Sequence, residues 1–300
     1  MQEDHSNLIH RRKFIRTAGI GLMGTALIKN AWNENIFSAS PAKIGLQLYT
    51  VRDQIKENVE KTLHRVAEYG FRGVETAFWP EHVSIAKAGK YLKDAGLSVC
   101  SAHIELPIDD KKKTDMLAAA EAYGCKRMIW HGWPEDKRYS SLDGTKELAD
   151  IYNQSYTFAK SHGLDFGLHN HWWEYRNKVD GGYVYQVLLE RVDPGIFFEI
   201  DTYWVKVAGH DPAKIVGEFG NRAKYLHIKD GPAKWNDNLP ADNPDPMVAV
   251  GKGTQNFPAI VKAAKGNTEW MIVEMDKTAS DIFAAIQDSY DYLTKNGLAE

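Results

Sequence analysis

Cysteine is scarce in this chain of 300 residues, and neither sign of charge is in marked excess. The two cysteines, Cys100 and Cys125, each stand among apolar residues. That setting argues against a disulfide scaffold or a thiolate metal cage and favours two buried structural thiols. The net charge is -3, and no run of lysine and arginine is long enough to follow a phosphate backbone. We therefore expect no nucleic-acid partner.

Other motifs are also missing. No GxGxxG follows the first expected strand, which weakens a dinucleotide-binding interpretation. The uncharged stretch from Thr17 to Ile28 is too short to span a bilayer comfortably, and no cysteine follows it that would carry a lipid. We therefore expect no membrane anchor. With 43% hydrophobic residues, the chain still has enough apolar material for a sizeable core.

The first forty residues have the pattern of an export signal. Residues Arg11–Arg16 read RRKFIR, a twin-arginine motif, and the short apolar stretch follows it directly. An ordinary basic-then-apolar helix is the alternative. We expect residues 1–40 to be a Tat signal peptide with a short linker, and the mature protein to be periplasmic. Because the Tat route carries folded proteins, often with a cofactor installed, a metal enzyme would suit it.

From Lys43 onward, short apolar runs alternate with amphipathic stretches of helical period, which is typical of repeated βα units around a parallel sheet. Eight runs are predicted to be strands: Ile44–Tyr49, Gly73–Ala77, Ser98–His103, Arg127–His131, Asp165–Asn170, Ile196–Asp201, Tyr225–Lys229 and Met271–Glu274. Helices are predicted between them, among them Val59–Tyr69, Lys113–Tyr123, Lys146–His162 and Ile282–Leu293. Several predicted helices end at a glycine: Gly70, Gly96, Gly124 and Gly163. Eight strands in about 250 residues favour a single-domain (β/α)8 TIM barrel over residues 41–300.

Polar residues finish the predicted strands, where a purely structural strand would be apolar. They are Glu75, His103, His131, His169, Asn170, Asp201, His227, Lys229 and Glu274. In a TIM barrel the active site lies at the carboxyl ends of the strands. Alternation along the strands directs His169, His227 and Lys229 inward, and it directs Glu199 and Asp201 inward as well.

Such a ring of carboxylates and imidazoles cannot stay unpaired, because buried ionised groups are costly without compensation. One divalent cation is the simplest compensation. Nitrogen and oxygen ligands without sulfur suit Mn²⁺, Co²⁺, Zn²⁺, Fe²⁺ or Mg²⁺.

The connection from Asp230 to Asn256 is unusually long and is rich in proline, aspartate, asparagine and glycine. It contains the sequence Gly251-Lys252-Gly253. Long loops in compact domains are usually functional or disordered. Because this one follows a barrel strand, we predict that it forms a lid or wall over the site.

Together these motifs resemble the xylose isomerase-like TIM barrels, the sugar phosphate isomerases/epimerases that include inosose dehydratase-like and hydroxypyruvate isomerase-like proteins. The resemblance runs from about Lys43 to Leu298. It rests on eight segments: Gly73–Glu75, Ser101–His103, His169–Glu174 (HNHWWE), Asp201–Trp204, Ala208–Pro212, His227–Asp230, Gly251–Gly253 and Val273–Asp276.

The resemblance implies one divalent metal ion held by a Glu, Asp, His, Glu quartet from strands five to eight. Asp201, His227 and Glu274 match three of these positions. The ligand from strand five stays open between Glu174 and His169. Glu174 is preferred, because three carboxylates and one imidazole keep the family's charge balance.

Roles for other residues follow from the same resemblance. Glu174 and Glu274 would double as acid/base groups, and Lys229 and His103 would neutralise a developing oxyanion or assist a leaving group. The remaining polar and aromatic residues of the predicted site are expected to bind substrate: Glu75, His131, His169, His171 and Trp204.

These expectations define a reaction class. A metal acting as a Lewis acid on a carbonyl and its neighbouring hydroxyl would make the C–H between them acidic. We expect a metal-dependent isomerase or epimerase acting on an unphosphorylated sugar, keto sugar or cyclitol. The alternatives are a metal-dependent dehydratase or lyase acting on a keto-glycoside, and a periplasmic carbohydrate-binding protein without catalysis. A homo-oligomer is compatible with the sequence.

Overall fold

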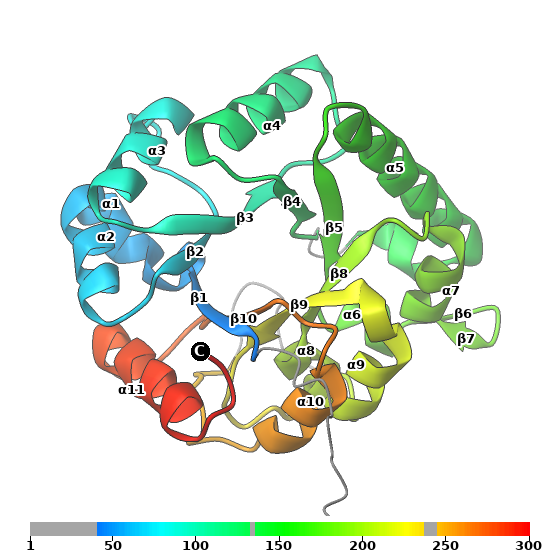
Figure 1. Cartoon of the computed structure of the whole chain (residues 1–300). Helices are drawn as coiled ribbons and strands as arrows, with labels where there is room; N and C mark the ends of the chain where they lie inside the picture. Colours follow the sequence, from blue (N-terminus) through cyan, green and yellow to red (C-terminus); the bar gives the residue numbers. More distant parts are fainter. Residues whose placement is uncertain (1–40, 133–135, 237–244) are drawn as a thin grey trace, which may run out of the picture. The chain divides into compact units, whose positions relative to one another are not determined.

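A computed structural model describes residues 41–132, 136–236 and 245–300. Eight parallel strands close into one barrel, in the order β1-β10-β9-β8-β5-β4-β3-β2, with the helices outside it (Figure 1). The barrel strands are β1 (Lys43–Gln47), β2 (Gly73–Thr76), β3 (Ser98–Ile104), β4 (Arg127–Trp130), β5 (Asp165–His169), β8 (Phe197–Asp201), β9 (Ala223–Ile228) and β10 (Trp270–Val273). The predicted (β/α)8 fold is confirmed. The expected Tat signal lies outside the described residues.

Several of the helices begin or end at residues that are typical of helix termini. They are α1 (Arg52–Glu57), α2 (Val59–Glu68), α3 (Ile85–Asp94), α4 (Asp110–Tyr123), α5 (Leu142–Ser161), α6 (Trp173–Arg176), α7 (Val184–Arg191), α8 (Thr202–Val207), α9 (Pro212–Phe219), α10 (Phe257–Ala264) and α11 (Ile282–Lys295). Side chains of Asn58, Ser84, Asp109 and Ser141 accept hydrogen bonds at the starts of α2 to α5. Gly124 ends α4 at a φ of 60°.

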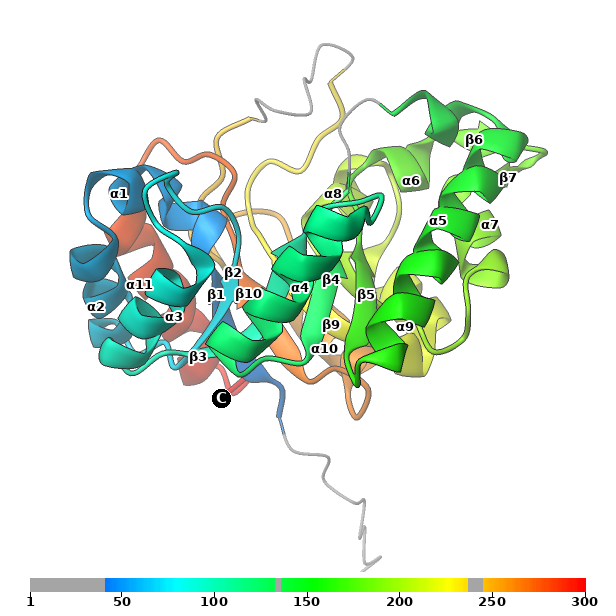
Figure 2. The same ribbon diagram turned by 90° about the horizontal axis from the view of Figure 1, so that it is seen from above.

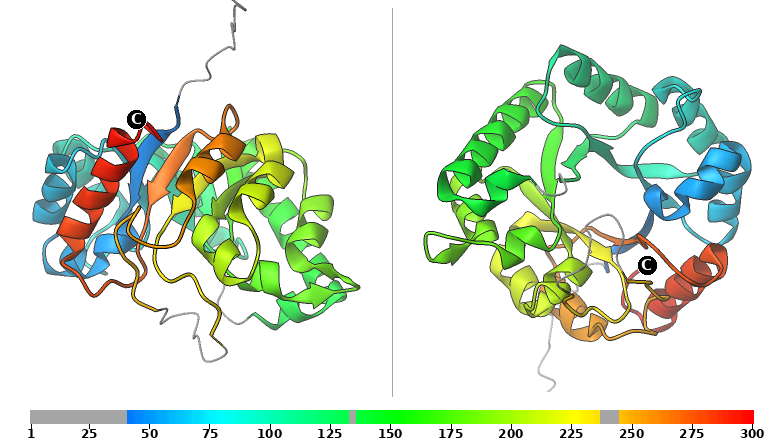
Figure 3. Two further views of the ribbon diagram at one scale, coloured as in Figure 1. Left: turned by 90° about the horizontal axis from the view of Figure 1, so that it is seen from below. Right: turned by 180° about the vertical axis from the view of Figure 1, so that it is seen from behind.

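A short antiparallel hairpin of β6 (Lys178–Val179) and β7 (Gly182–Tyr183) was not predicted. Strands of two residues leave no period-two pattern to detect. The hairpin, α6 and α8 stand at one edge of the barrel, where the strands end (Figure 2). At the opposite edge, the backbone of Glu300 bonds to Ala42 and Ile44, so the C-terminus lies beside the start of β1 (Figure 3).

The predicted alternation of strand faces is confirmed. Outward residues such as Phe166, Phe198 and Leu226 belong to the main core between the barrel and the helices. A separate apolar cluster fills the barrel interior: Cys100, Ile129, Phe197, Tyr225 and Ile272. Both cysteines are free and buried, as expected. In the described part of the chain, no helix is both long enough and apolar enough to cross a bilayer.

The carboxylate of Asp230 organises the described ends of the long loop that follows β9. One oxygen accepts from the backbone N–H groups of Gly231 and Gln255, at 2.9 and 3.1 Å, and the other accepts from Gly251 and Gly253, at 3.0 and 2.9 Å. A Cβ on Gly253 would lie 2.1 Å from this carboxylate, which explains the second glycine of the motif. The middle of the loop, residues 237–244, lies outside the described residues, so the predicted lid stays a prediction.

Replacing Asp230 by alanine should destabilise the fold. Asp230 is 1% exposed, and the substitution removes the acceptor of four backbone N–H groups. A buried donor without a partner costs about 1–3 kcal/mol, unless a water molecule takes the place of the lost acceptor. We expect the free energy of unfolding to fall by at least about 2 kcal/mol in urea titrations followed by circular dichroism. Asp143→Ala is the control, because that side chain is 96% exposed. Equal unfolding midpoints for the two variants would contradict this account.

Candidate metal centre

A pocket opens at the carboxyl ends of the strands. Its walls contain many residues that the sequence singled out and several that it did not: Tyr49, Ala77, Phe78, His103, His131, Gly132, His169, His171, Trp173, Trp204, Lys229, Glu274 and Asp276. The predicted site residues Glu75, Glu174, Asp201 and His227 are buried around this pocket rather than lining it.

Asp201 is held at the end of β8 by two sets of bonds. Its Oδ1 accepts from the backbone N–H groups of Tyr203 and Trp204, both at 2.9 Å, which caps α8. Its own N–H donates to the side-chain oxygen of Asn170 at 3.0 Å. The second carboxylate oxygen, Oδ2, is left for the pocket side. Asn170 therefore ties the ends of β5 and β8 together, a role that the sequence did not indicate.

Four buried atoms meet above the barrel interior and form what we call the upper cluster: His169 Nδ1, Asp201 Oδ2, His227 Nδ1 and Glu274 Oε2. The first three residues offer ligand atoms within 4.8 Å of one another, and His227 Nδ1 lies 2.7 Å from Glu274 Oε2. His169 Nδ1 also lies 3.4 Å from Glu199 Oε2, an oxygen deeper in the barrel. Within the described ranges, none of these four atoms has a well-directed hydrogen bond. Buried polar atoms are rarely left in this state. Two nitrogens and two oxygens fit a divalent cation.

Lys229 places an ammonium group beside this cluster. Its Nζ lies 2.9 Å from Asp201 Oδ2, 2.7 Å from Glu274 Oε2 and 2.8 Å from Asp276 Oδ2. Burial lowers the pKa of Lys229, but these three carboxylates outweigh it and hold the pKa well above its usual range. The group is therefore charged. Asp276 was not among the predicted site residues, although it follows Glu274 by two positions and so shares its face.

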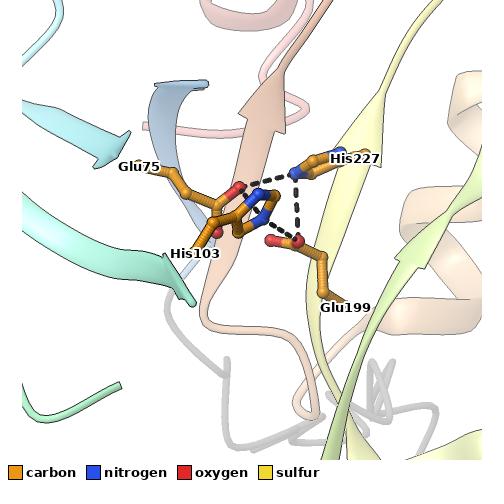
Figure 4. Close-up of side chains that lie close together, drawn as sticks. All are labelled: Glu75, His103, Glu199 and His227. Atoms are coloured by element: carbon orange, nitrogen blue, oxygen red, sulfur yellow. Dashed lines mark hydrogen bonds and ion pairs between the residues drawn. The ribbon is translucent and has the colours of Figure 1, made fainter. Parts of the chain in front are cut away.

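Deeper in the barrel lies a second group, the lower cluster, of Glu75, His103, Glu199 and His227 (Figure 4). His227 Nε2 is 2.7 Å from Glu75 Oε1 and 3.1 Å from Glu199 Oε2. His103 Nε2 is 3.0 and 3.2 Å from the same two oxygens. His227 thus belongs to both clusters, with one ring nitrogen in each.

Burial and charge set the protonation of the lower cluster. Burial raises the pKa of Glu75, but the imidazoles of His103 and His227 overcome this and hold it well below its usual range. Burial, with the charge of Glu75, raises the pKa of Glu199. Burial lowers the pKa of His103, yet the two carboxylates raise it to about 9. Without a metal ion, a proton is thus held between these carboxylates.

Burial is the main influence on the two histidines at the end of β5. Together with the positive charge of neighbours such as Lys229 and His227, it lowers the pKa of His169 and of His171 well below the usual value, so both rings are neutral. A neutral imidazole is the form that ligates metals. His171 stacks on Trp173 at 4.2 Å between ring centroids, which fixes its plane beside the pocket.

Glu174 does not reach the upper cluster. Its carboxylate accepts a hydrogen bond from the backbone N–H of His171 at 3.0 Å, and it lines a small cavity on the outer side of β5 with residues such as Leu168 and Tyr152. Burial raises its pKa to about 8. Of the two ligands weighed for strand five, the structure brings His169 to the cluster and keeps Glu174 behind the strand.

The pocket walls also contain aromatic faces. Trp204 is nearly fully buried, while Phe78 is 59% exposed at the pocket. Phe78 contacts Tyr49 and His131 edge-on, with ring centroids 6.5 and 5.6 Å away. Such faces suit the apolar side of a sugar ring.

Glu174 should make the stability of the protein depend on pH. Its pKa is about 8 in the folded protein and 4.5 in an ordinary exposed glutamate. Between pH 4.5 and 8, Glu174 is therefore neutral in the folded protein and ionised in the unfolded chain. Unfolding then releases a proton, so the free energy of unfolding falls as pH rises from 4.5 to 8, by up to about 1.4 kcal/mol per unit. Below 4.5 the effect vanishes.

Glu174→Gln, which stays neutral, should therefore gain stability over the wild type between pH 5 and 8. Urea unfolding at three pH values measures this gain, and Glu190→Gln, at an exposed position, is the control. Parallel pH profiles for the wild type and Glu174→Gln would show that the carboxyl group does not titrate in this way.

Comparisons with known proteins agree with this architecture. The family model described as xylose isomerase-like TIM barrel matches residues 63–296. No protein with a curated description matches the sequence.

Solved structures of similar fold include several enzymes. A sugar phosphate isomerase/epimerase from Parabacteroides distasonis ATCC 8503 is 25% identical over 86% of this chain and 100% of its own, with a TM-score of 0.70. A probable 3-DHS dehydratase from Bacillus anthracis is 16% identical over 84% and 98%, with a TM-score of 0.65. An L-ribulose 3-epimerase is 16% identical over 85% and 94%, with a TM-score of 0.62. Since the family model covers most of the chain, this protein belongs to the xylose isomerase-like TIM barrel family.

Proposed function

We propose that this protein is a divalent-metal-dependent sugar isomerase or epimerase that removes a proton from the carbon next to a carbonyl group. The observation that carries the proposal is the upper cluster. Buried nitrogen and oxygen atoms of His169, Asp201, His227 and Glu274 converge at the ends of four neighbouring strands, with the ammonium of Lys229 among them, beside a pocket with aromatic walls. Such a donor set at the carboxyl end of a barrel is a site for chemistry rather than for stability.

His169, Asp201, His227 and Glu274 would hold the metal ion. When bound, the ion supplies a Lewis acid for a carbonyl and its neighbouring hydroxyl. We assign His169 rather than Glu174 to the position on strand five, because the carboxylate of Glu174 is bonded to a backbone N–H behind the strand. Glu174 is then a buried neutral acid and not an acid/base group.

Three ionisable groups at the pocket are assigned the proton transfers. Burial raises the pKa of Glu274, but Lys229 and His227 outweigh it and lower the pKa, so this carboxylate is ionised and faces the pocket as a proton acceptor. The ammonium of Lys229, held 2.7 Å from Glu274, can donate to an oxygen that becomes negative. His103, protonated and at the pocket wall, can return a proton to the substrate.

The lining of the pocket supports an unphosphorylated substrate. Among the described residues that line it, Lys229 is the only lysine and there is no arginine. Three carboxylates already surround that lysine, and the proposed divalent ion would only bring their sum to zero, so a phosphate group would find no net positive charge. The aromatic walls suit a sugar, a keto sugar or a cyclitol. We further propose that the enzyme works in the periplasm, on the basis of the twin-arginine motif.

A dehydratase or lyase acting on a keto-glycoside is the second candidate, because its first step is the same proton removal. Lys229 and His103 favour it as groups that can assist a leaving group. A carbohydrate-binding protein without catalysis would bind sugars but exchange no protons.

Solvent exchange tests the proposed chemistry. With candidate ketoses and keto-glycosides in D2O, NMR should show deuterium entering the carbon next to the carbonyl. Glu274→Gln should slow this exchange by about 10²- to 10⁴-fold, because it removes the proton acceptor. Asp143→Asn, at an exposed helical position, should leave the rate unchanged. Sugar binding by the wild type without any exchange would favour the binding protein.

Substrate preference tests the charge argument. We expect kcat/KM for an unphosphorylated ketose to exceed that for its phosphate ester by at least about tenfold, or about 1.4 kcal/mol, because the ester would lose hydrating water without gaining a cationic partner. Steady-state kinetics with matched pairs of sugars and sugar phosphates measure this ratio. Turnover of phosphorylated sugars alone would contradict it.

A further inference from the structure

The lower cluster has two more short contacts than its hydrogen bonds explain. His227 Nε2 bonds to Glu75 Oε1 at 2.7 Å and His103 Nε2 bonds to Glu199 Oε2 at 3.2 Å. Each nitrogen also lies within 3.1 Å of the other carboxylate, His227 Nε2 at 3.1 Å from Glu199 Oε2 and His103 Nε2 at 3.0 Å from Glu75 Oε1. A ring nitrogen has one hydrogen, which points to one acceptor at a time. Two such hydrogens cannot serve four short contacts with good alignment. The four atoms instead surround a common centre, as the dashed lines in Figure 4 show.

Gln47 orients the carboxylate of Glu75 beside the ring of His103. Its side-chain oxygen accepts from the backbone N–H of Tyr49 at 2.9 Å, so the orientation of the amide is fixed. Its nitrogen donates to Glu75 at 2.7 Å and lies 3.4 Å from both Nδ1 and Nε2 of His103. One oxygen of Glu75 is therefore held at the common centre.

The charge of the lower cluster then depends on the upper one. If His227 gives Nδ1 to a cation in the upper cluster, as proposed above, it has no charge of its own. The carboxylates of Glu75 and Glu199 are 0% exposed, and the proton on His103 offsets only part of their charge when both are ionised. Such charge requires compensation. A divalent cation at the common centre supplies it and meets all four atoms.

We propose that the lower cluster is a second cation site, with Glu75, His103, Glu199 and His227 as ligands. The Nε2 protons of both rings are released to solvent when this ion binds, so His227 lies between two metal ions as an imidazolate and His103 acts as a ligand in place of a proton donor. Two imidazole nitrogens and two carboxylate oxygens suit Zn²⁺, Mn²⁺, Fe²⁺ or Co²⁺. A tetrahedral ion with bonds of about 2.0–2.1 Å separates its ligand atoms by about 3.3 Å. The observed separations need only a few tenths of an ångström of expansion.

The surroundings of the lower cluster are those of a prepared site. Ser101 donates to Glu75 Oε2 at 2.5 Å and Gln47 donates to Oε1, so both oxygens of this carboxylate are oriented. Glu199 Oε1 is buried without a hydrogen-bond partner among the described residues. The apolar residues of the barrel interior, such as Ile129 and Ile272, exclude water from this level. His103 lines the pocket, which gives an ion a route of entry.

Metal stoichiometry tests this inference, which rests on the proposed function for the upper ion only. The chain is purified without chelators, loaded with Zn²⁺ or Mn²⁺, dialysed and measured by elemental analysis. We expect two ions per wild-type chain. Glu199→Gln should keep one ion, in the upper cluster, and Asp201→Asn should keep one, in the lower cluster. Anomalous diffraction from wild-type crystals should show one peak on each side of the His227 ring.

The possible failures are distinguishable. One ion per wild-type chain, lost in Asp201→Asn and kept in Glu199→Gln, would overturn the second site and leave the proposed function standing. If the wild type binds one ion and only Glu199→Gln loses it, the ion lies in the lower cluster. That result would overturn both the two-ion centre and the upper site. No bound ion would overturn both. If Glu199→Gln fails to fold, Glu75→Gln and the wild-type anomalous map decide the same question.

Discussion

Negative charge gathered inside a barrel is the constraint on which the rest of this structure depends. Glu75, Glu199, Asp201, Glu274 and Asp276 converge at the carboxyl ends of the strands, and all but Asp276 are almost fully buried. The ammonium of Lys229 is their one buried lysine or arginine partner among the described residues. Buried carboxylates of this kind persist only with compensation. Imidazoles and protons supply part of this compensation, and in our proposal metal ions supply the rest.

The fold supplies this charge by simple means. A strand alternates its side chains, so every second position faces the barrel interior. Closure of eight parallel strands then brings positions far apart in the sequence to one level: Glu199 lies opposite Tyr225 and Asp201 opposite His227 in the register of β8 and β9. Local bonds add precision, because the first turn of α8 and Asn170 together hold Asp201 in place. The buried charge lowers the stability of the fold, which is the usual cost of a chemically active site.

The sequence predicted the barrel and the inward direction of its polar residues, because both depend on periods of two and 3.6 residues. The sequence did not predict how deep in the barrel each polar side chain lies. Glu199 and Asp201 both point inward, but two residues along the strand separate them into the lower and upper clusters. It also could not decide between His169 and Glu174, because the reach of a side chain beyond a strand depends on which backbone N–H it meets. Both depend on tertiary contacts, which no local pattern contains: the structure places His169 beside Asp201 and His227, and Glu174 on a backbone N–H behind the strand.

The imidazole at the end of β5 changes the charge of the upper cluster. In the proposed function, His169 and His227 would be neutral ligands of the upper ion, so Asp201 and Glu274 would contribute -2, which one divalent ion would cancel. A carboxylate at the first position would leave the centre negative. Lys229 and Asp276 cancel each other at 2.8 Å. A neutral centre withdraws electrons from a carbonyl more strongly than a negative one. It also offers no excess positive charge for a phosphate, so an imidazole in place of a carboxylate at this position would favour an uncharged sugar.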